Sequence, residues 1–240
     1  MEKRLSNGLS FLGAYTFSKA LDVQSSASLN FLSPSPQSDP GGGLRDSRYP
    51  GEEKGLADFN VPNRFAYSMS YAVPYGRGKE FGANSNSLVN ALAGGWELQT
   101  VTSLQSGSPR TVVANIGDSN SDGENRPDVV RGVPVKGSPE GPSNWLNPAA
   151  FQTAVPGTFG NAGRNTIPTQ GIVQVDFSLF KDFNLGERAK LQFRGEFFNL
   201  INHPNFQVWS LDTTWGLSSF GEYSAAMPAR QIQLALKLIF

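Results

Sequence analysis

The segment IVQVDFSLFKDFNLGERAKLQFRGEF, residues 172–197, contains two runs in which apolar and polar side chains alternate, separated by a short turn. Alternation with a period of two is typical of a β-strand whose two faces meet different surroundings. One face of this pair carries Val173, Val175, Phe177, Leu179, Phe183, Leu191, Phe193 and Phe197. The other carries Gln174, Asp176, Ser178, Asp182, Lys190, Gln192, Arg194 and Glu196. The segment therefore predicts an antiparallel pair of strands with one apolar face and one polar face.

Four other segments repeat this pattern, which gives six predicted strands at about residues 9–19, 63–73, 96–106, 171–183, 189–201 and 230–240. Each is roughly 10 to 13 residues long, whereas a typical strand has about 5 or 6. A tilted strand needs about 9 to 11 residues to cross a bilayer. Strand length therefore favours a transmembrane β-barrel. Aromatic girdles mark the membrane interfaces of such barrels, and the candidates for them here are Tyr67, Tyr71, Trp96 and Phe183.

The connections between the predicted strands alternate in length. The turn at 184–188 is short, and the connection at 74–95 is of medium length, with one or two turns of helix expected from Ser87 to a glycine pair. Three long segments, roughly 20–61, 108–170 and 203–228, are rich in Gly, Pro, Ser and Asn. Because they occupy every second connection, all three are expected on one side of the sheet, as extracellular loops opposite short periplasmic turns.

These features predict an all-β fold, an antiparallel transmembrane β-barrel fragment that occupies residues 1–240 and lies in the cell outer membrane of a Gram-negative-type cell. A soluble β-sandwich also has alternating strands, but its strands are shorter and it has no reason to separate long loops from short ones. Lys plus Arg and Asp plus Glu number 20 each, so no net charge favours a nucleic-acid partner. The chain has no cysteine and no apolar run of about 20 residues, so a thiolate metal site and a transmembrane helix are excluded.

Several motifs carry a resemblance to a known family. They are GLSFLGAYTFSKALD, NRFAYSMSYAVPYGRGK, GGWELQTVTSLQSGSP, NRPDVV, NPAAFQ, GTFGNAGRNT and the hairpin with its continuation to NHPNF. In their order and spacing, the chain resembles the C-terminal part of the Oar-like TonB-dependent receptors. The resemblance implies a barrel of about 22 strands around a plug domain. Because about six strands and neither plug nor TonB motif are found here, we expect a piece of such a barrel whose beginning is missing.

The resemblance also implies a function and a set of partners. The parent protein would take up an unknown solute across the outer membrane with energy relayed by the TonB complex, without enzymatic chemistry and without a cofactor. Its other partners would be outer-membrane lipid, the rest of the barrel, the plug domain and the barrel assembly machinery. The alternative is a surface or adhesion-type barrel whose loops bind partners without transport.

The final segment, RQIQLALKLIF at 230–240, alternates up to a terminal aromatic residue. In outer-membrane proteins, such an ending resembles the signal that the assembly machinery reads. We therefore expect Leu236, Leu238 and Phe240 to act as an assembly signal.

A few residues invite a chemical interpretation. Asp118, Asn120 and Asp122 have the opening spacing of a calcium loop, but the twelfth position is Val129 instead of glutamate, so a polar turn is favoured and no metal site is predicted. His203 is the only histidine, and without a G-x-S-x-G motif we expect a loop residue at the outer rim instead of a catalytic residue. Charged side chains are expected in the barrel lumen, paired with each other or with a plug: Arg64, Asp176, Lys190, Arg194 and Glu196.

Overall fold

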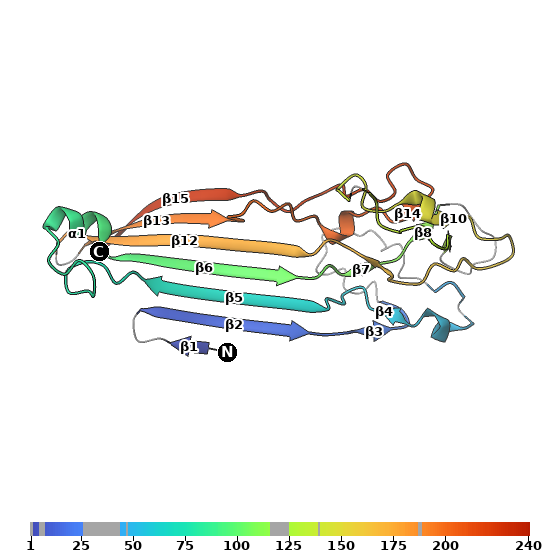
Figure 1. The fold of residues 1–240 in the computed structure, drawn as a ribbon, viewed down its shortest axis with the longest axis horizontal. Coiled ribbons are helices and arrows are strands. Elements are labelled where there is room, and N and C mark those ends of the chain that lie inside the picture. The colour runs from blue at the N-terminus through green and yellow to red at the C-terminus, as the bar shows by residue number, and fades with distance from the viewer. Residues whose placement is uncertain are drawn as a thin grey trace.

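The computed structural model describes residues 2–4, 8–25, 44–46, 48–115, 125–138, 140–186 and 189–240. Six long strands form one antiparallel sheet, with a short strand, β1 (Glu2–Arg4), added at one edge (Figure 1). The long strands are, in spatial order, β2 (Leu9–Phe17), β5 (Asn63–Ala72), β6 (Trp96–Gln105), β12 (Ile172–Asn184), β13 (Lys190–Phe198) and β15 (Gln231–Ile239). The prediction of six long antiparallel strands is therefore confirmed.

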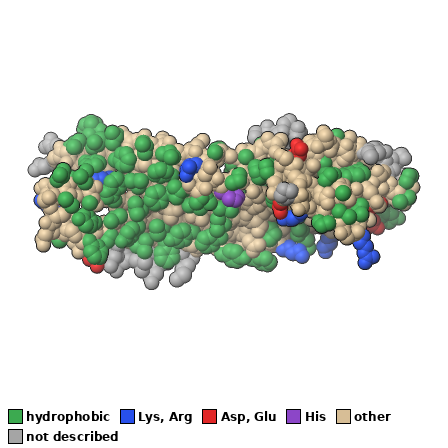
Figure 2. Space-filling model, turned by 45° about the horizontal axis from the view of Figure 1, so that its top comes forward, with side chains coloured by type: hydrophobic (Ala, Val, Ile, Leu, Met, Phe, Trp, Pro, Cys, Tyr) green, Lys and Arg blue, Asp and Glu red, His purple; other side chains and the backbone are tan. Residues whose placement is uncertain are grey.

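The pairing register keeps the two faces of the sheet chemically separate from one edge to the other. Tyr71 lies opposite Leu98, which in turn lies opposite Leu179. The same face continues through the opposed pairs Phe193–Leu236 and Leu191–Leu238 on the last two strands. Hydrophobic side chains accordingly spread over the strand half of the molecule in Figure 2, with few charged groups among them.

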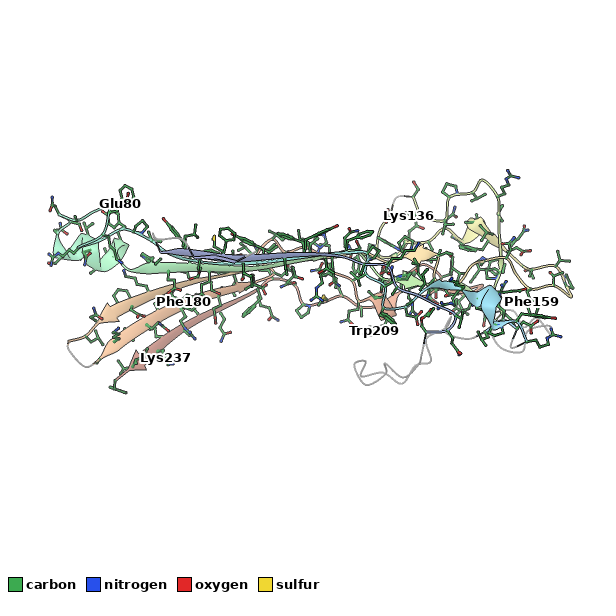
Figure 3. The ribbon with its side chains drawn as sticks, turned by 90° about the horizontal axis from the view of Figure 1, so that it is seen from below. Glu80, Lys136, Phe159, Phe180, Trp209 and Lys237 are labelled. Carbon is green, nitrogen blue, oxygen red and sulfur yellow. The ribbon has the colours of Figure 1, made fainter. Side chains whose placement is uncertain are left out.

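The sheet is curved and open. Figure 3 shows β12, β13 and β15 turning away from the plane shared by β2, β5 and β6. Strand β15 pairs on one side only, with β13, and the opposite edge is formed by β1 and β2. Both edges therefore present backbone groups that could pair with a further strand.

One short helix, α1 (Ser87–Ala93), lies at the end of the sheet in the connection from β5 to β6 (Figure 1). The Asn86 side chain accepts a hydrogen bond from Val89 N at 2.8 Å, which caps the first turn. Gly94 follows the last turn, and Gly95 has a φ of 73°, a conformation that glycine adopts without strain. The helix expected from Ser87 to the glycine pair is thus confirmed. Among the described residues, no helix is long and apolar enough to cross a membrane.

The three long connections meet at the other end of the sheet in a folded body, which we call the loop head (Figure 1). Short strands pair within it: β3 (Leu21–Asp22) with β4 (Gly55–Leu56), β7 (Pro109–Arg110) with β11 (Ile167–Pro168), β8 (Val113–Ala114) with β14 (Thr214–Trp215), and β9 (Asp128–Val129) with β10 (Phe151–Gln152). Among the described residues, three 3-10 turns complete it: η2 (Pro50–Glu53), η3 (Pro148–Ala150) and η4 (Val208–Ser210). Composition alone indicated long polar loops, whereas the structure gives them local pairing.

The buried apolar cluster of the described chain lies in the loop head and not in the sheet. It draws on the second and third long connections and contains Val112, Trp145, Leu146, Ala150, Phe151, Ile167, Leu211 and Phe220. Phe151 and Phe220 meet edge to face with their ring centroids 5.6 Å apart. No side chain of the six long strands belongs to the buried hydrophobic set, because no second layer of protein packs along either face of the sheet.

Gly160, in the GTFGNAGRNT motif, is held at a close backbone crossing in the loop head. A Cβ added to Gly160 would lie 1.8 Å from the carbonyl oxygen of Arg126. The Gly160 carbonyl also accepts a hydrogen bond of 2.8 Å from Nη1 of Arg45, which belongs to the first long connection. This glycine therefore lets two segments of the second long connection approach more closely than any side chain would allow.

Replacing Gly160 with alanine is expected to destabilise the loop head by about 1–3 kcal/mol or more, because the added methyl group forces the two backbones apart. Gly141→Ala is the matched control, since a Cβ at Gly141 has no neighbour within 4 Å. Hydrogen exchange of loop-head amides measures the effect. Equal exchange in the two variants would contradict the close crossing.

Candidate functional site

The apolar face of the sheet is a surface exposed across the strands. On β15, Ile232, Leu234 and Leu236 expose 60%, 66% and 67% of their surface. Soluble monomers rarely leave apolar patches of this extent in water. A face built this way suits the hydrocarbon of a bilayer.

Aromatic side chains gather at both ends of the apolar face. Tyr71, Trp96 and Phe183 lie at strand ends close to α1. At the loop-head end, Tyr15 lies opposite Phe65 and its hydroxyl donates to Asn63 Oδ1 at 2.7 Å. Neither Tyr15 on β2 nor Phe65 on β5 was among the predicted girdle residues. Tyr67, which was, lies in the middle of β5 instead of at an end.

The polar face carries a set of side-chain hydrogen bonds. Glu97 Oε1 accepts from Ser70 Oγ and from Gln99 Nε2, each at 2.9 Å. Asp176 Oδ1 accepts from Gln174 Nε2 at 2.6 Å and from the backbone N–H of Asn199 at 2.9 Å. These carboxylates are therefore held by amides and hydroxyls.

The expected pairing of the polar-face charges with each other is wrong for the residues that the structure describes. No ion pair joins any two of Arg64, Asp176, Lys190, Arg194 and Glu196. The guanidinium of Arg194 instead lies over the ring of Phe180, 5.1 Å from its centroid, because these two residues are direct cross-strand neighbours. Stacking of this kind leaves a cation without a carboxylate partner on the polar face.

Where β12 meets the loop head, the Asn205 side chain hydrogen-bonds to the backbone of β12 as a neighbouring strand would. Asn205 Oδ1 accepts from Val173 N at 2.8 Å, and its Nδ2 donates to Val173 O at 2.9 Å. His203 lies beside it, with Nδ1 3.0 Å from Asn205 Oδ1. His203 thus lies in the loop just after the turn that follows β13, where its ring contacts the asparagine that binds the backbone of β12.

Glu53 forms the first of two ionic clamps in the loop head. Its Oε1 accepts from Nε of Arg45 at 2.6 Å, and its Oε2 lies 2.8 Å from Nη1 of Arg126. The side chains of Glu53 and Arg126 are almost completely buried. Burial alone would raise the pKa of Glu53, but the hydrogen bond from Arg45 and the charges of Arg126 and Arg45 outweigh it and lower that pKa below 4.5.

Arg164 forms the second clamp and joins the first and second long connections. Its Nε donates to Glu53 O at 3.0 Å and its Nη1 to Ser25 Oγ at 3.1 Å. Its Nη2 donates to the backbone oxygen of Asp22 at 2.7 Å and also to the Asp22 carboxylate. Asp58 Oδ1 lies 4.0 Å from Nη1. One buried guanidinium therefore satisfies hydrogen-bond acceptors on residues far from it in the sequence.

A polar cleft of about 570 Å³ lies beside the two clamps. Its walls include Glu52, Gly55, Asn161 and the exposed side chains of Lys19 and Lys54. Neither ammonium group forms an ion pair with another described residue. The cleft therefore offers two available cations at the edge of a rigid ionic framework.

A second, apolar cavity of about 250 Å³ lies against the buried cluster. Trp145, Leu146, Phe151 and Ile167 line it, together with Lys136. The Lys136 ammonium lies 5.3 Å from the Trp145 ring centroid and 3.1 Å from Glu140 Oε1. This cavity can hold only a small apolar group.

A family model described as Outer membrane beta barrel domain matches residues 1–233. The chain belongs to this family. Comparison with curated proteins and with solved structures gave no match.

Membership of the outer membrane beta barrel family gives the two faces of the sheet their roles. The chain is a protein of the cell outer membrane. Strands of such barrels turn apolar side chains to lipid and polar side chains to the lumen. We therefore refer below to the lipid-facing and lumenal faces of the sheet.

The remaining sequence-predicted residues are placed only in part. Asp118, Asn120 and Asp122 lie outside the described residues. In the part of the chain that is described, no group of three His, Asp or Glu side chains is arranged to hold a metal ion. Leu236, Leu238 and Phe240 are exposed at the end of β15 and lie beyond the range that the family model matches.

Sequence reasoning missed the buried clamp arginines and the two asparagines that bind backbone groups, although motifs contained them. Arg126 belongs to NRPDVV, Arg164 to GTFGNAGRNT, Asn147 to NPAAFQ and Asn205 to NHPNF. Asn147 Oδ1 accepts from Ala149 N at 3.1 Å and caps η3. The signal available in the sequence was that each motif places Asn or Arg next to Gly or Pro, a combination suited to fixing a turn.

Glu53→Gln is expected to destabilise the loop head by about 3 kcal/mol at neutral pH, because it leaves the buried Arg126 without its carboxylate. Since the pKa of Glu53 is lowered by folding, its stabilising effect is complete above pH 4.5 and is lost as the pH falls through the lowered value. The difference between wild type and variant should therefore shrink in acid. Urea unfolding followed by tryptophan fluorescence measures it, with the exposed neighbour Glu52→Gln as control. A difference that does not depend on pH would contradict the assignment.

Leu234→Arg is expected to reduce assembly into the membrane, because a cation on the lipid-facing side costs about 2–4 kcal/mol near the middle of the bilayer. Gln233→Arg places the same charge on the adjacent residue, which faces the lumen next to Glu196. The folded fraction in outer-membrane preparations, read from its heat-modifiable mobility on gels, distinguishes the two. Equal loss in both variants would show that the faces are assigned incorrectly.

Proposed function

We propose that the chain supplies wall and loops to an Oar-like TonB-dependent receptor that takes up a solute across the outer membrane. The proposal rests on the motif resemblance and, in the structure, on one observation above all. The sheet of six long strands and β1 is open and curved, and its lumenal face carries charges that do not pair with each other. Such a face suits a wide lumen that contains further protein.

A wide barrel needs more strands than the six long ones described here. About eight strands enclose only enough space for side chains, and about 22 are needed for a lumen that holds a plug. The free edges at β1–β2 and at β15 are the places where the rest of the barrel would pair. The lumenal cations Arg64 and Arg194 are then the candidates for contact with a plug domain, and residues outside this chain would engage the TonB complex.

The loop head is the proposed region of solute contact. Its clamps hold the polar cleft in one shape, and a preformed site loses less conformational entropy on binding. Lys19 and Lys54 would attract anionic groups of a solute at the cleft. At the opposite end of the sheet, Leu236, Leu238 and Phe240 are proposed to be read by the barrel assembly machinery.

A surface or adhesion-type barrel is the second candidate. The observation that favours it is the ordered loop head itself, whose buried apolar cluster would also support a rigid partner-binding surface. In this case the loops would bind a partner with no requirement for energy.

Depletion of solutes from the growth medium tests the proposal. Cells that carry the complete gene are compared with cells that lack it, each with and without a functional TonB, and the medium is profiled by mass spectrometry. We expect one or more solutes to be depleted only when both gene and TonB are present. A protonophore should abolish this depletion.

Two results would overturn the proposal. Depletion that persists without TonB would remove the energy coupling. Absence of any gene-dependent depletion, together with gene-dependent attachment of cells to a surface or to other cells, would favour the adhesion-type barrel.

The double variant Lys19→Ala with Lys54→Ala tests whether the solute contacts the polar cleft. It should weaken uptake without changing the amount of protein in the membrane.

A further inference from the structure

Helix α1 exposes apolar side chains at the end of the sheet away from the loop head. Leu88 and Leu92 are 69% and 64% exposed, and Val89 is 38% exposed. Leu88 and Leu92 are four residues apart, so they lie on the same side of the helix. The stretch from Phe81 to Trp96 contains no charged residue. The helix itself therefore carries no charge, and the Arg77 guanidinium contacts its first turn, where Nη2 donates to Ser87 Oγ at 2.9 Å.

Two side chains of the lipid-facing surface fix α1 in place. Trp96 Nε1 donates to the backbone oxygen of Leu92 at 3.0 Å, and the ammonium of Lys181 donates to the backbone oxygen of Gly94. Trp96 and Lys181 lie opposite each other on the same face as Leu98 and Leu179. The helix is thus attached on the lipid side of the sheet and not on the lumenal side.

Lys181 explains why a helix is needed at this position. It breaks the apolar alternation of β12, since a cation occupies a lipid-facing position. Its side chain is nevertheless only 3% exposed, and its ammonium lies 5.2 Å and 5.1 Å from the ring centroids of Trp96 and Phe183. The carbonyl of Gly94, directly after α1, and the two rings together shield the charge from lipid.

We propose that α1 is an interfacial membrane helix, and that Leu88 and Leu92 insert into the phospholipid leaflet beside the barrel wall. The occupant is lipid because the exposed surface of α1 continues the lipid-facing surface of the sheet through Trp96, an amphipathic residue that favours the membrane interface. A short helix with one apolar side can lie in this plane with that side among the acyl chains. The proposal does not depend on solute uptake.

Single-cysteine labelling tests the insertion directly, because the chain has no native cysteine. Leu88→Cys and Leu92→Cys are labelled with bimane in the full chain reconstituted into phosphatidylcholine vesicles. Ala93→Cys is the matched control, since Ala93 is exposed on a different side of the same helix. Each sample is quenched by iodide in the buffer and, separately, by lipid brominated along its acyl chain.

We expect blue-shifted emission at positions 88 and 92, strong quenching by brominated lipid and weak quenching by iodide. The control at 93 should show the reverse. Equal iodide quenching at all three positions would overturn the proposal, as would protection from both quenchers at 88 and 92, which indicates contact with protein. A Lys181→Met variant should retain the pattern, because methionine removes the charge and keeps an apolar chain under the helix, whereas loss of the pattern would show that the ammonium alone positions α1.

Discussion

Cross-strand register is the constraint on which the rest of this structure depends. Each pairing places positions of one face opposite positions of the same face, so that the rows through Tyr71, Leu98 and Leu179 stay on one side. Side chains alternate along a strand, and a slip of one residue in any pairing would therefore turn charges such as Asp176 and Arg194 toward lipid. The lipid-facing surface, the lumenal charges and the position of α1 all follow from this one alignment.

The loop head is stabilised by buried polar contacts and not by strand register. Its connections are rich in glycine, proline and polar residues, which offer few apolar side chains for a core. Buried guanidinium groups compensate: Arg164 satisfies Asp22, Ser25 and Glu53, which are remote from it in sequence. Because such groups are stable only when every partner is present, the clamps favour a single arrangement of the loops. That rigidity is what a cleft with fixed cations requires.

The sequence was sufficient to predict the features that depend on local periodicity. The six strands, their two faces and the helix ending at Gly94 and Gly95 all show in the order of side chains. The clamps could not be predicted, because Arg164 and Glu53 meet across 111 positions and no periodicity relates them. Arg194 was expected to find a carboxylate, but its cross-strand neighbour is Phe180. Lys181 could have drawn notice as the one cation on an apolar row, yet only the structure shows the helix that covers it.

Because the buried cluster lies apart from the sheet, the stability of the loop head depends on water and that of the wall depends on hydrocarbon. Water holds the loop head together, since expulsion of water from around Val112, Leu146 and Phe151 stabilises it. The wall has no such cluster among the described residues and relies on hydrocarbon around it. Chaotropes should therefore act first on the head, while a change of detergent acts first on the wall. The head and the wall therefore depend on different surroundings, so conditions that loosen one need not loosen the other.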